Sequence, residues 1–178
     1  MVHLWGSRAK EESQMSKSAL GESAKGDVAV VVCGDRLDTN LISLGCLLAK
    51  GAKRKVHFVR VIEVPRALPL KAVLSDKSEQ ASQLLNDAME IARKVGCEAV
   101  AEVVQAREAG PAIVEEATDH HCSLLLISSP RRNHVALNDF GKTIAYVLDN
   151  APCRVCFMQD PTPQAQAQAQ AAQQAAVS

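Results

Sequence analysis

Apolar and polar residues follow two periods along this chain, and the switches between them predict a repeating order of strands and helices. Continuous apolar or β-branched runs at residues 28–33, 55–62, 99–104, 124–128 and 154–158 predict five strands. Between them, apolar residues recur at helical spacing over residues 41–48, 81–95, 113–117 and 144–148. Continuously apolar strands that alternate with helices predict an α/β domain, whose parallel sheet is covered by helices on both faces.

Helix starts and stops are also marked. Asp76 with Glu79 resembles a capping box, and Asn138 or Asp139 is expected to cap the last helix. Gly96 is expected to end the second helix, since glycine accepts the left-handed conformation found there.

The ends of the chain lack these periods. Residues 1–26 are rich in Ser, Lys and Glu, and residues 161–178 are nearly all Gln and Ala after two prolines. Both are predicted to be disordered tails, which leaves one domain at residues 27–160. Of the 178 residues, 47% are apolar and only 3% aromatic, so the expected core is aliphatic.

Charge and cysteine content narrow the class of protein. Lys plus Arg equals Asp plus Glu, 20 each, which argues against a nucleic-acid binder that needs a basic surface. The 6 cysteines occur without a secretory signal, so we expect reduced thiols in the cytoplasm. No apolar stretch approaches the roughly 20 residues of a membrane span.

Ligands of such sheets bind beyond the carboxyl ends of the strands, which points to the loops at residues 34–38, 63–75 and 128–138. The last loop contains Arg131 and Arg132 and leads into a helix start at Gly141, Lys142 and Thr143. The free amides and positive dipole end of a helix start favour an anion. These residues predict an anion site. The alternative is an ordinary basic loop in front of a helix.

Two cysteine and histidine patterns predict packing rather than chemistry. Cys153 and Cys156 lie on a predicted strand, where a spacing of three points the side chains to opposite faces. Zinc would need a second pair, and the sequence has none at similar spacing. His120 and His121 end a helix with Cys122 beside them, and the sequence shows no further ligand there, so no metal site is expected.

Enzyme motifs are missing from the sequence. There is no G-x-S-x-G elbow, Walker A motif or G-x-G-x-x-G pattern. Asp35 and Asp38 follow the first strand, as in phosphorylated receiver domains, but the third strand ends near Gln105 without the Asp that those domains need. We therefore expect a protein that is not an enzyme.

The order of elements and several segments resemble the universal stress protein family over roughly residues 27–160. "VAVVVCGDRLDTNLISLGCLLAK" resembles the family's first strand and helix, and "VHFVRVIEVP" its second strand. "AIVEEATDHHCSLLLISS" and "GKTIAYVLDNAPCRVCFM" resemble its later helices and strands. The resemblance implies the adenine nucleotide alpha hydrolase-like fold with strand order 3-2-1-4-5. The stretches "QAREAGPAIVEEA", "SSPRR" and "APCRV" resemble members fused behind amino-acid permeases.

Nucleotide-binding members of this family have Gly-x-x-Gly, nine residues, then Gly-Ser or Gly-Thr after the fourth strand. Here the first glycine falls on Ser128 and the second on Arg131, whereas the third is kept as Gly141. The family's Asp after the first strand falls on Cys33, and its adenine contact falls near Val59. The resemblance thus implies ligand contacts at Cys33, Gly34, Val59, Ser128, Ser129, Arg131, Arg132, Gly141, Lys142 and Thr143.

Two functions follow as expectations. In the first, the chain is a non-catalytic regulatory module that senses AMP, ATP or a cyclic adenine nucleotide through a degenerate phosphate loop, with Mg²⁺ only beside a triphosphate. It would act on a partner, with a membrane transporter as the candidate. In the second, it is a ligand-free interaction or stress protein of the same fold. In both we expect a homodimer through the last strand, residues 154–158, because apolar sheet edges are usually covered.

Overall fold

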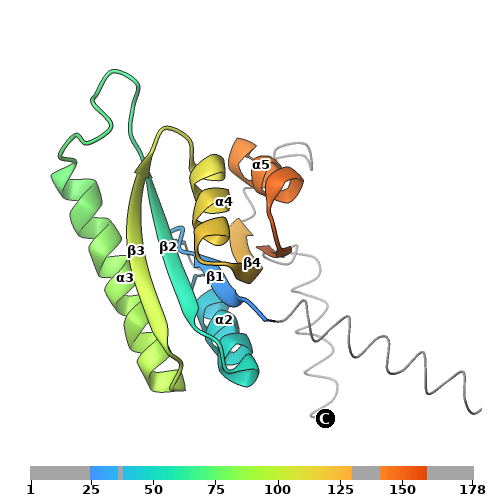
Figure 1. Ribbon diagram of the computed structural model, residues 1–178. Helices are drawn as coiled ribbons and strands as arrows, with labels where there is room; N and C mark the ends of the chain where they lie inside the picture. Colours follow the sequence, from blue (N-terminus) through green and yellow to red (C-terminus); the bar gives the residue numbers. More distant parts are fainter. Residues whose placement is uncertain (1–24, 36–37, 130–140, 160–178) are drawn as a thin grey trace, which may run out of the picture.

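The alternating pattern folds as a five-stranded parallel sheet with helices between the strands. The computed structural model describes residues 25–35, 38–129 and 141–159. The strands are β1 (Asp27–Val31), β2 (Val56–Glu63), β3 (Ala99–Ala106), β4 (Cys122–Ser129) and β5 (Arg154–Gln159). The helices are α2 (Asp38–Ala52), α3 (Ser75–Val95), α4 (Ala109–Asp119) and α5 (Lys142–Asn150). The sheet order is β3-β2-β1-β4-β5 with every pair parallel, which confirms the predicted fold class and strand order (Figure 1).

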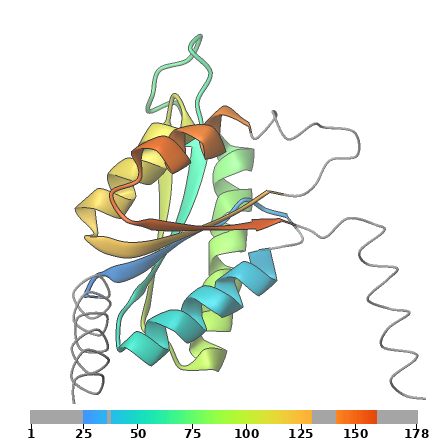
Figure 2. The same ribbon diagram turned by 90° about the vertical axis from the view of Figure 1, so that its right-hand side faces the viewer.

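Helices cover both faces of the sheet, α2 and α3 on one face and α4 and α5 on the other (Figure 2). Two apolar clusters fill the resulting layers. Leu41, Phe58 and Leu126 belong to the cluster under α2 and α3. Ile113 and Val147 belong to the cluster under α4 and α5. β1 contributes to both because consecutive strand residues face opposite sides of the sheet, which explains its continuously apolar sequence.

Two predicted helix starts are wrong. The N-cap of α3 is Leu74, which makes no side-chain cap hydrogen bond, so Asp76 with Glu79 does not form a capping box. Polar residues are equally common inside the first turn, and here Asp76 lies within it. α5 begins at Lys142 with Gly141 as N-cap, later than the expected cap at Asn138 or Asp139, which lie outside the described residues. By contrast, Gly96 ends α3 in the left-handed conformation with φ 73°, as predicted.

The Cys153 and Cys156 prediction is confirmed. Cys156 packs against the cluster under α2 and α3, and Cys153 against the cluster under α4 and α5. The two thiols therefore lie on opposite faces of the sheet. No helix in the described part of the chain is both long and apolar enough to cross a membrane.

Candidate functional site

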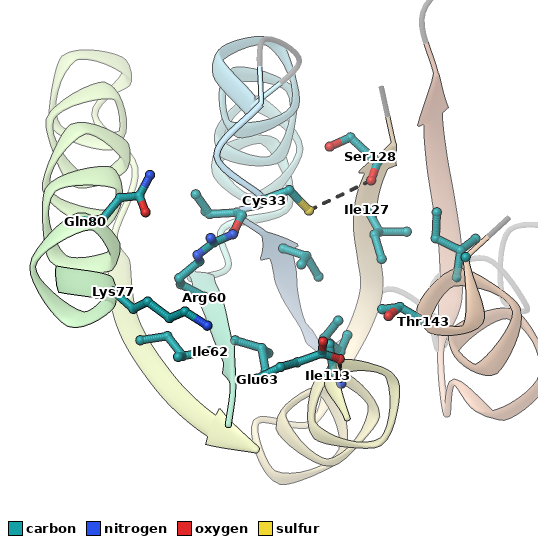
Figure 3. Close-up of a pocket in the computed structure, with 16 residues that line it drawn as sticks. Cys33, Arg60, Ile62, Glu63, Lys77, Gln80, Ile113, Ile127, Ser128 and Thr143 are labelled. Atoms are coloured by element: carbon teal, nitrogen blue, oxygen red, sulfur yellow. Dashed lines mark hydrogen bonds between the residues drawn. The ribbon is translucent and has the colours of Figure 1, made fainter. Parts of the chain in front are cut away.

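A cavity of about 560 Å³ opens at the carboxyl ends of the central strands. Figure 3 shows its two sides: Arg60, Lys77 and Gln80 on one, and Ser128 and Thr143 on the other. This position is the edge where ligands of doubly wound sheets bind. The volume lies within the 300–1,000 Å³ range, roughly, that small-molecule sites occupy.

The turn after β1 forms one wall and is held by Asp38. The Cys33 and Gly34 amides donate to the Asp38 carboxylate at 3.2 Å and 2.6 Å. Gly34 has φ 80°, a left-handed conformation that a side chain would strain. Burial raises the pKa of Asp38 although both amides favour the charged carboxylate. Asp38 therefore links the end of β1 to the start of α2.

Cys33 lines the cavity at the position of the family's Asp. Its thiol lies 3.9 Å from the Ser128 carbonyl oxygen, to which it donates. Burial first, and the carboxylates of Asp38 and Asp35 second, raise the pKa of this thiol to about 11. Cys33 consequently offers a ligand a neutral, weakly donating group where the family pattern has a charged acceptor.

The start of α5 forms the facing wall. Gly141 is the N-cap, and both Gly141 and Thr143 line the cavity. Gly141 has φ −46° and ψ 152°, and a Cβ built there meets nothing within 4 Å. The first amides of a helix have no intrahelical partner, and the dipole adds positive potential. This wall therefore favours an anionic group.

A third wall is formed by Arg60 and Glu63 of β2 and Lys77 and Gln80 of α3, and sequence reasoning missed these residues. The Arg60 guanidinium donates through Nη1 to the Val32 carbonyl oxygen at 3.0 Å, and its buried Nε has no hydrogen-bond partner among the described residues. Glu63 accepts the Ala109 amide at 2.9 Å and so anchors the start of α4. Arg60 in an otherwise apolar strand was the available signal.

The structure brings together four predicted contacts around the cavity: Cys33, Ser128, Gly141 and Thr143. Gly34 shapes the adjoining turn, and Lys142 is exposed as the first residue of α5. Val59 is only 2% exposed and does not line the cavity, because it lies one position before Arg60, inside the strand. Ser129 ends β4, and Arg131 and Arg132 lie outside the described residues.

One group of potential metal ligands borders the cavity. Single ligand atoms of Cys33, Asp35 and Asp38 all lie within 4.8 Å of one another. However, both Asp38 oxygens already accept backbone amides, and the high pKa of Cys33 keeps its thiol protonated. These residues are better explained as the structural end of β1 than as a metal site.

A parallel five-stranded sheet in this order, with a cavity at the switch between β1 and β4, defines a doubly wound α/β protein whose ligand site is expected at this switch point. The model of the universal stress protein family matches residues 25–158. The chain belongs to the universal stress protein family.

Solved structures agree in fold. A universal stress protein from Archaeoglobus fulgidus is 18% identical with a TM-score of 0.63, over 74% of this chain and 97% of that one. A structure of the Archaeoglobus fulgidus protein in complex with dAMP is 17% identical with a TM-score of 0.60, and the match covers 75% of this chain and 98% of that one. A family member from Arabidopsis thaliana with AMP bound is 13% identical with a TM-score of 0.53, and the match covers 77% of this chain and 93% of that one. No curated protein matches the sequence. The likeness to permease-fused members stays a prediction.

Proposed function

We propose that this chain is a non-catalytic regulatory module that binds an adenine nucleotide in the cavity at the start of α5. The main observation behind this proposal is that the cavity joins the α5 N-terminus to the ends of β1 and β4, with Gly141 and Thr143 at its wall. Relatives of the same fold are named as complexes with dAMP, with AMP and with cAMP. Those names concern the relatives, and they support a nucleotide as the first ligand to test.

The cavity suits an anionic ligand on physical grounds. The helix start supplies free amides and a positive dipole end. Arg60 and Lys77 add two cationic side chains on the wall formed by β2 and α3, beside the carboxylate of Glu63, while Asp35 and Asp38 border the cavity next to Cys33. The helix start and these two cations favour a phosphate away from Cys33, while Val61, Ile113 and Ile127 offer an apolar lining to a base.

The same residues support a role without catalysis. A nucleophile or general base needs a pKa near the working pH. The pKa of Cys33 is about 11, and the Asp38 carboxylate is occupied by backbone amides. Among the described lining residues, Glu63 is likewise occupied, by the amide of Ala109.

Substitution of Gly141 tests the proposal with a matched pair. Asp and Ser are both good N-caps, and the open space at Gly141 accepts either. Gly141→Asp places a negative charge where the phosphate is expected, whereas Gly141→Ser does not. Isothermal titration with AMP, dAMP, cyclic AMP and ATP, the last with and without Mg²⁺, should show binding to the wild type and to Gly141→Ser. Gly141→Asp should lose at least about 10-fold in affinity, or roughly 1.4 kcal/mol.

Equal affinity in Gly141→Asp and Gly141→Ser would place the ligand elsewhere. Absence of binding for all four nucleotides would favour the ligand-free interaction protein instead. In that case a membrane transporter is the first partner to test.

The oligomeric proposal rests on β5. It is an edge strand of the sheet, and its residues are all partly buried or exposed rather than fully buried. A second copy that pairs with this edge would cover it. Sedimentation velocity should show a dimer that persists on dilution, and a monomer at every concentration would contradict the proposal.

A further inference from the structure

A second group of titratable side chains lies toward the amino ends of the strands, away from the cavity. α4 runs back along the sheet from the carboxyl ends of the strands, so its last turn reaches this region (Figure 1). There His120 Nε2 lies 3.3 Å from Glu116 Oε2 and 3.5 Å from Glu102 Oε2. Glu116 lies in α4, His120 is the C-cap residue that follows α4, and Glu102 lies in β3.

The spacing of these atoms is that of metal ligands. One ligand atom each from Glu102, Glu116 and His120 lie within 4.8 Å of one another. Ligand atoms about 2.1 Å from a tetrahedral metal are about 3.4 Å apart, close to the distances from His120 Nε2 to the two carboxylates. Glu116 and His120 are four residues apart and therefore lie on the same side of α4. A cation can enter this group with little change in side-chain position.

A stacked histidine is the second, independent observation. The His57 ring lies against the His120 ring with centroids 4.2 Å apart and an interplanar angle of 21°. His57 is 8% exposed, and its Nε2 pairs with Asp27 Oδ2 at 2.9 Å. Its Nδ1 is buried without a hydrogen-bond partner among the described residues.

These contacts hold the ring of His120 in place. Stacking restricts its rotation, so Nε2 stays directed at the two carboxylates, and ligands that are oriented in advance bind metal more tightly. His57 is not one of the three residues of the ligand group, so it contributes by positioning the His120 ring.

We propose that Glu102, Glu116 and His120 bind a divalent transition-metal ion through one imidazole nitrogen and two carboxylate oxygens. Their side chains are 52%, 17% and 30% exposed, so an ion reaches them from solvent and keeps water as a further ligand. The imidazole favours Zn²⁺, Co²⁺ or Ni²⁺ over Mg²⁺ and Ca²⁺. The ion would join the end of α4 to β3 and stabilise the helix without a part in nucleotide binding.

Zinc and cobalt titrations of the full, reduced chain test the site. Zn²⁺ should raise the melting temperature of the wild type. Glu102→Gln and His120→Asn should each weaken Zn²⁺ binding by about 10-fold or more, since each removes one of three ligands. His121→Asn is the matched control: His121 is the exposed neighbour with φ 49°, a conformation that Asn tolerates, and its substitution should leave binding unchanged.

Cobalt distinguishes this site from the cysteines. Co²⁺ held by nitrogen and oxygen should give weak visible bands that are lost in Glu102→Gln. An intense thiolate-to-metal absorption that survives in Glu102→Gln would overturn the proposal, because thiols would then hold the metal. Equal Zn²⁺ affinity in wild type, Glu102→Gln and His120→Asn would also overturn it. The lack of any response to millimolar Zn²⁺ would overturn it as well.

Discussion

The two ends of the sheet use charge in opposite ways. At the carboxyl ends, Arg60, Lys77 and the start of α5 place positive potential around the cavity. Toward the amino ends, carboxylates gather around histidines instead: Glu102 and Glu116 face His120, and Asp27 faces His57. In a parallel fold the helices start near the carboxyl ends of the strands and end near their amino ends. Because the helix dipole is positive at the start and negative at the end, the first region favours anions and the second favours cations.

Removal of a core side chain should have the largest effect on the free energy of unfolding and should destabilise both ends of the sheet. Phe58 is fully buried in β2, the strand that also carries His57 and Arg60. Phe58→Ala should lower the free energy of unfolding by about 3–5 kcal/mol, measured by urea unfolding. Val73→Ala, at a side chain 89% exposed, is the control and should change it by less than about 0.5 kcal/mol. An equal cost in both variants would contradict the described core.

The rate of Cys33 alkylation tests the cavity at the carboxyl ends of the strands without testing the other end. The pKa of this thiol is raised from 9.0 to about 11. Because only the thiolate reacts, iodoacetamide at neutral pH should modify Cys33 about 100-fold more slowly in the folded chain than in urea. Residue-resolved mass spectrometry gives both rates, and bound AMP should slow the folded rate further. Similar rates in folded and unfolded chain would show that Cys33 is not held in the described environment.

Displacement of α5 should affect ligand binding at the carboxyl ends of the strands and leave metal binding at the other end unchanged. A Cβ at Gly110 would lie 2.8 Å from the Cβ of Tyr146, so Gly110→Ala should push α5 away from α4. We expect a cost of about 1–3 kcal/mol in stability, weaker nucleotide binding and an unchanged response to Zn²⁺. Gly51→Ala, where a Cβ meets nothing within 4 Å, is the matched control and should not destabilise. Equal losses at both ends would show that the two sites are coupled.

Loss of the hydrogen bond between Asp27 and His57 should have the smallest effect on stability. Burial opposes the charge of Asp27, but hydrogen bonds from His57 and the Lys55 amide outweigh it and leave the pKa below its ordinary 3.8. A lowered folded pKa stabilises the protein above pH 3.8, and this contribution is lost as pH falls through the folded value.

Asp27→Asn should therefore cost about 1.5 kcal/mol at pH 7 and almost nothing well below pH 3.8. Urea unfolding at the two pH values measures the difference. A cost that does not depend on pH would assign the effect of Asp27 to packing rather than to its charge.

Sequence reasoning located the carboxyl-end site because topology determines it. Apolar strands such as residues 28–33 fix the sheet, and the family spacing leads from Ser128 to Gly141. It missed Arg60 and Lys77, since no motif shows which residues of β2 and α3 reach one cavity. It placed the adenine contact near Val59, whereas the cavity begins one residue later and is lined by residues 60–63, because only the last part of β2 reaches it.

The amino-end cluster was missed for a related reason. The sequence showed no ligand beside His120, yet folding brings Glu102 from 18 positions earlier and Glu116 from the preceding turn. The helix start at Asn138 or Asp139 failed differently. Capping residues favour a start but do not determine it, and α5 begins at Lys142, two residues before Ile144 packs into the core.

The most direct measurement is an amide chemical-shift map of the labelled chain during titration with AMP. We predict that signals of Cys33, Gly34, Gly141, Lys142 and Thr143 shift in proportion to occupancy, whereas those of Glu102, Glu116 and His120 stay in place. Titration with Zn²⁺ should give the reverse pattern. A map in which AMP leaves the Gly141–Thr143 amides unmoved, or shifts the amino end instead, would contradict nucleotide binding at the start of α5.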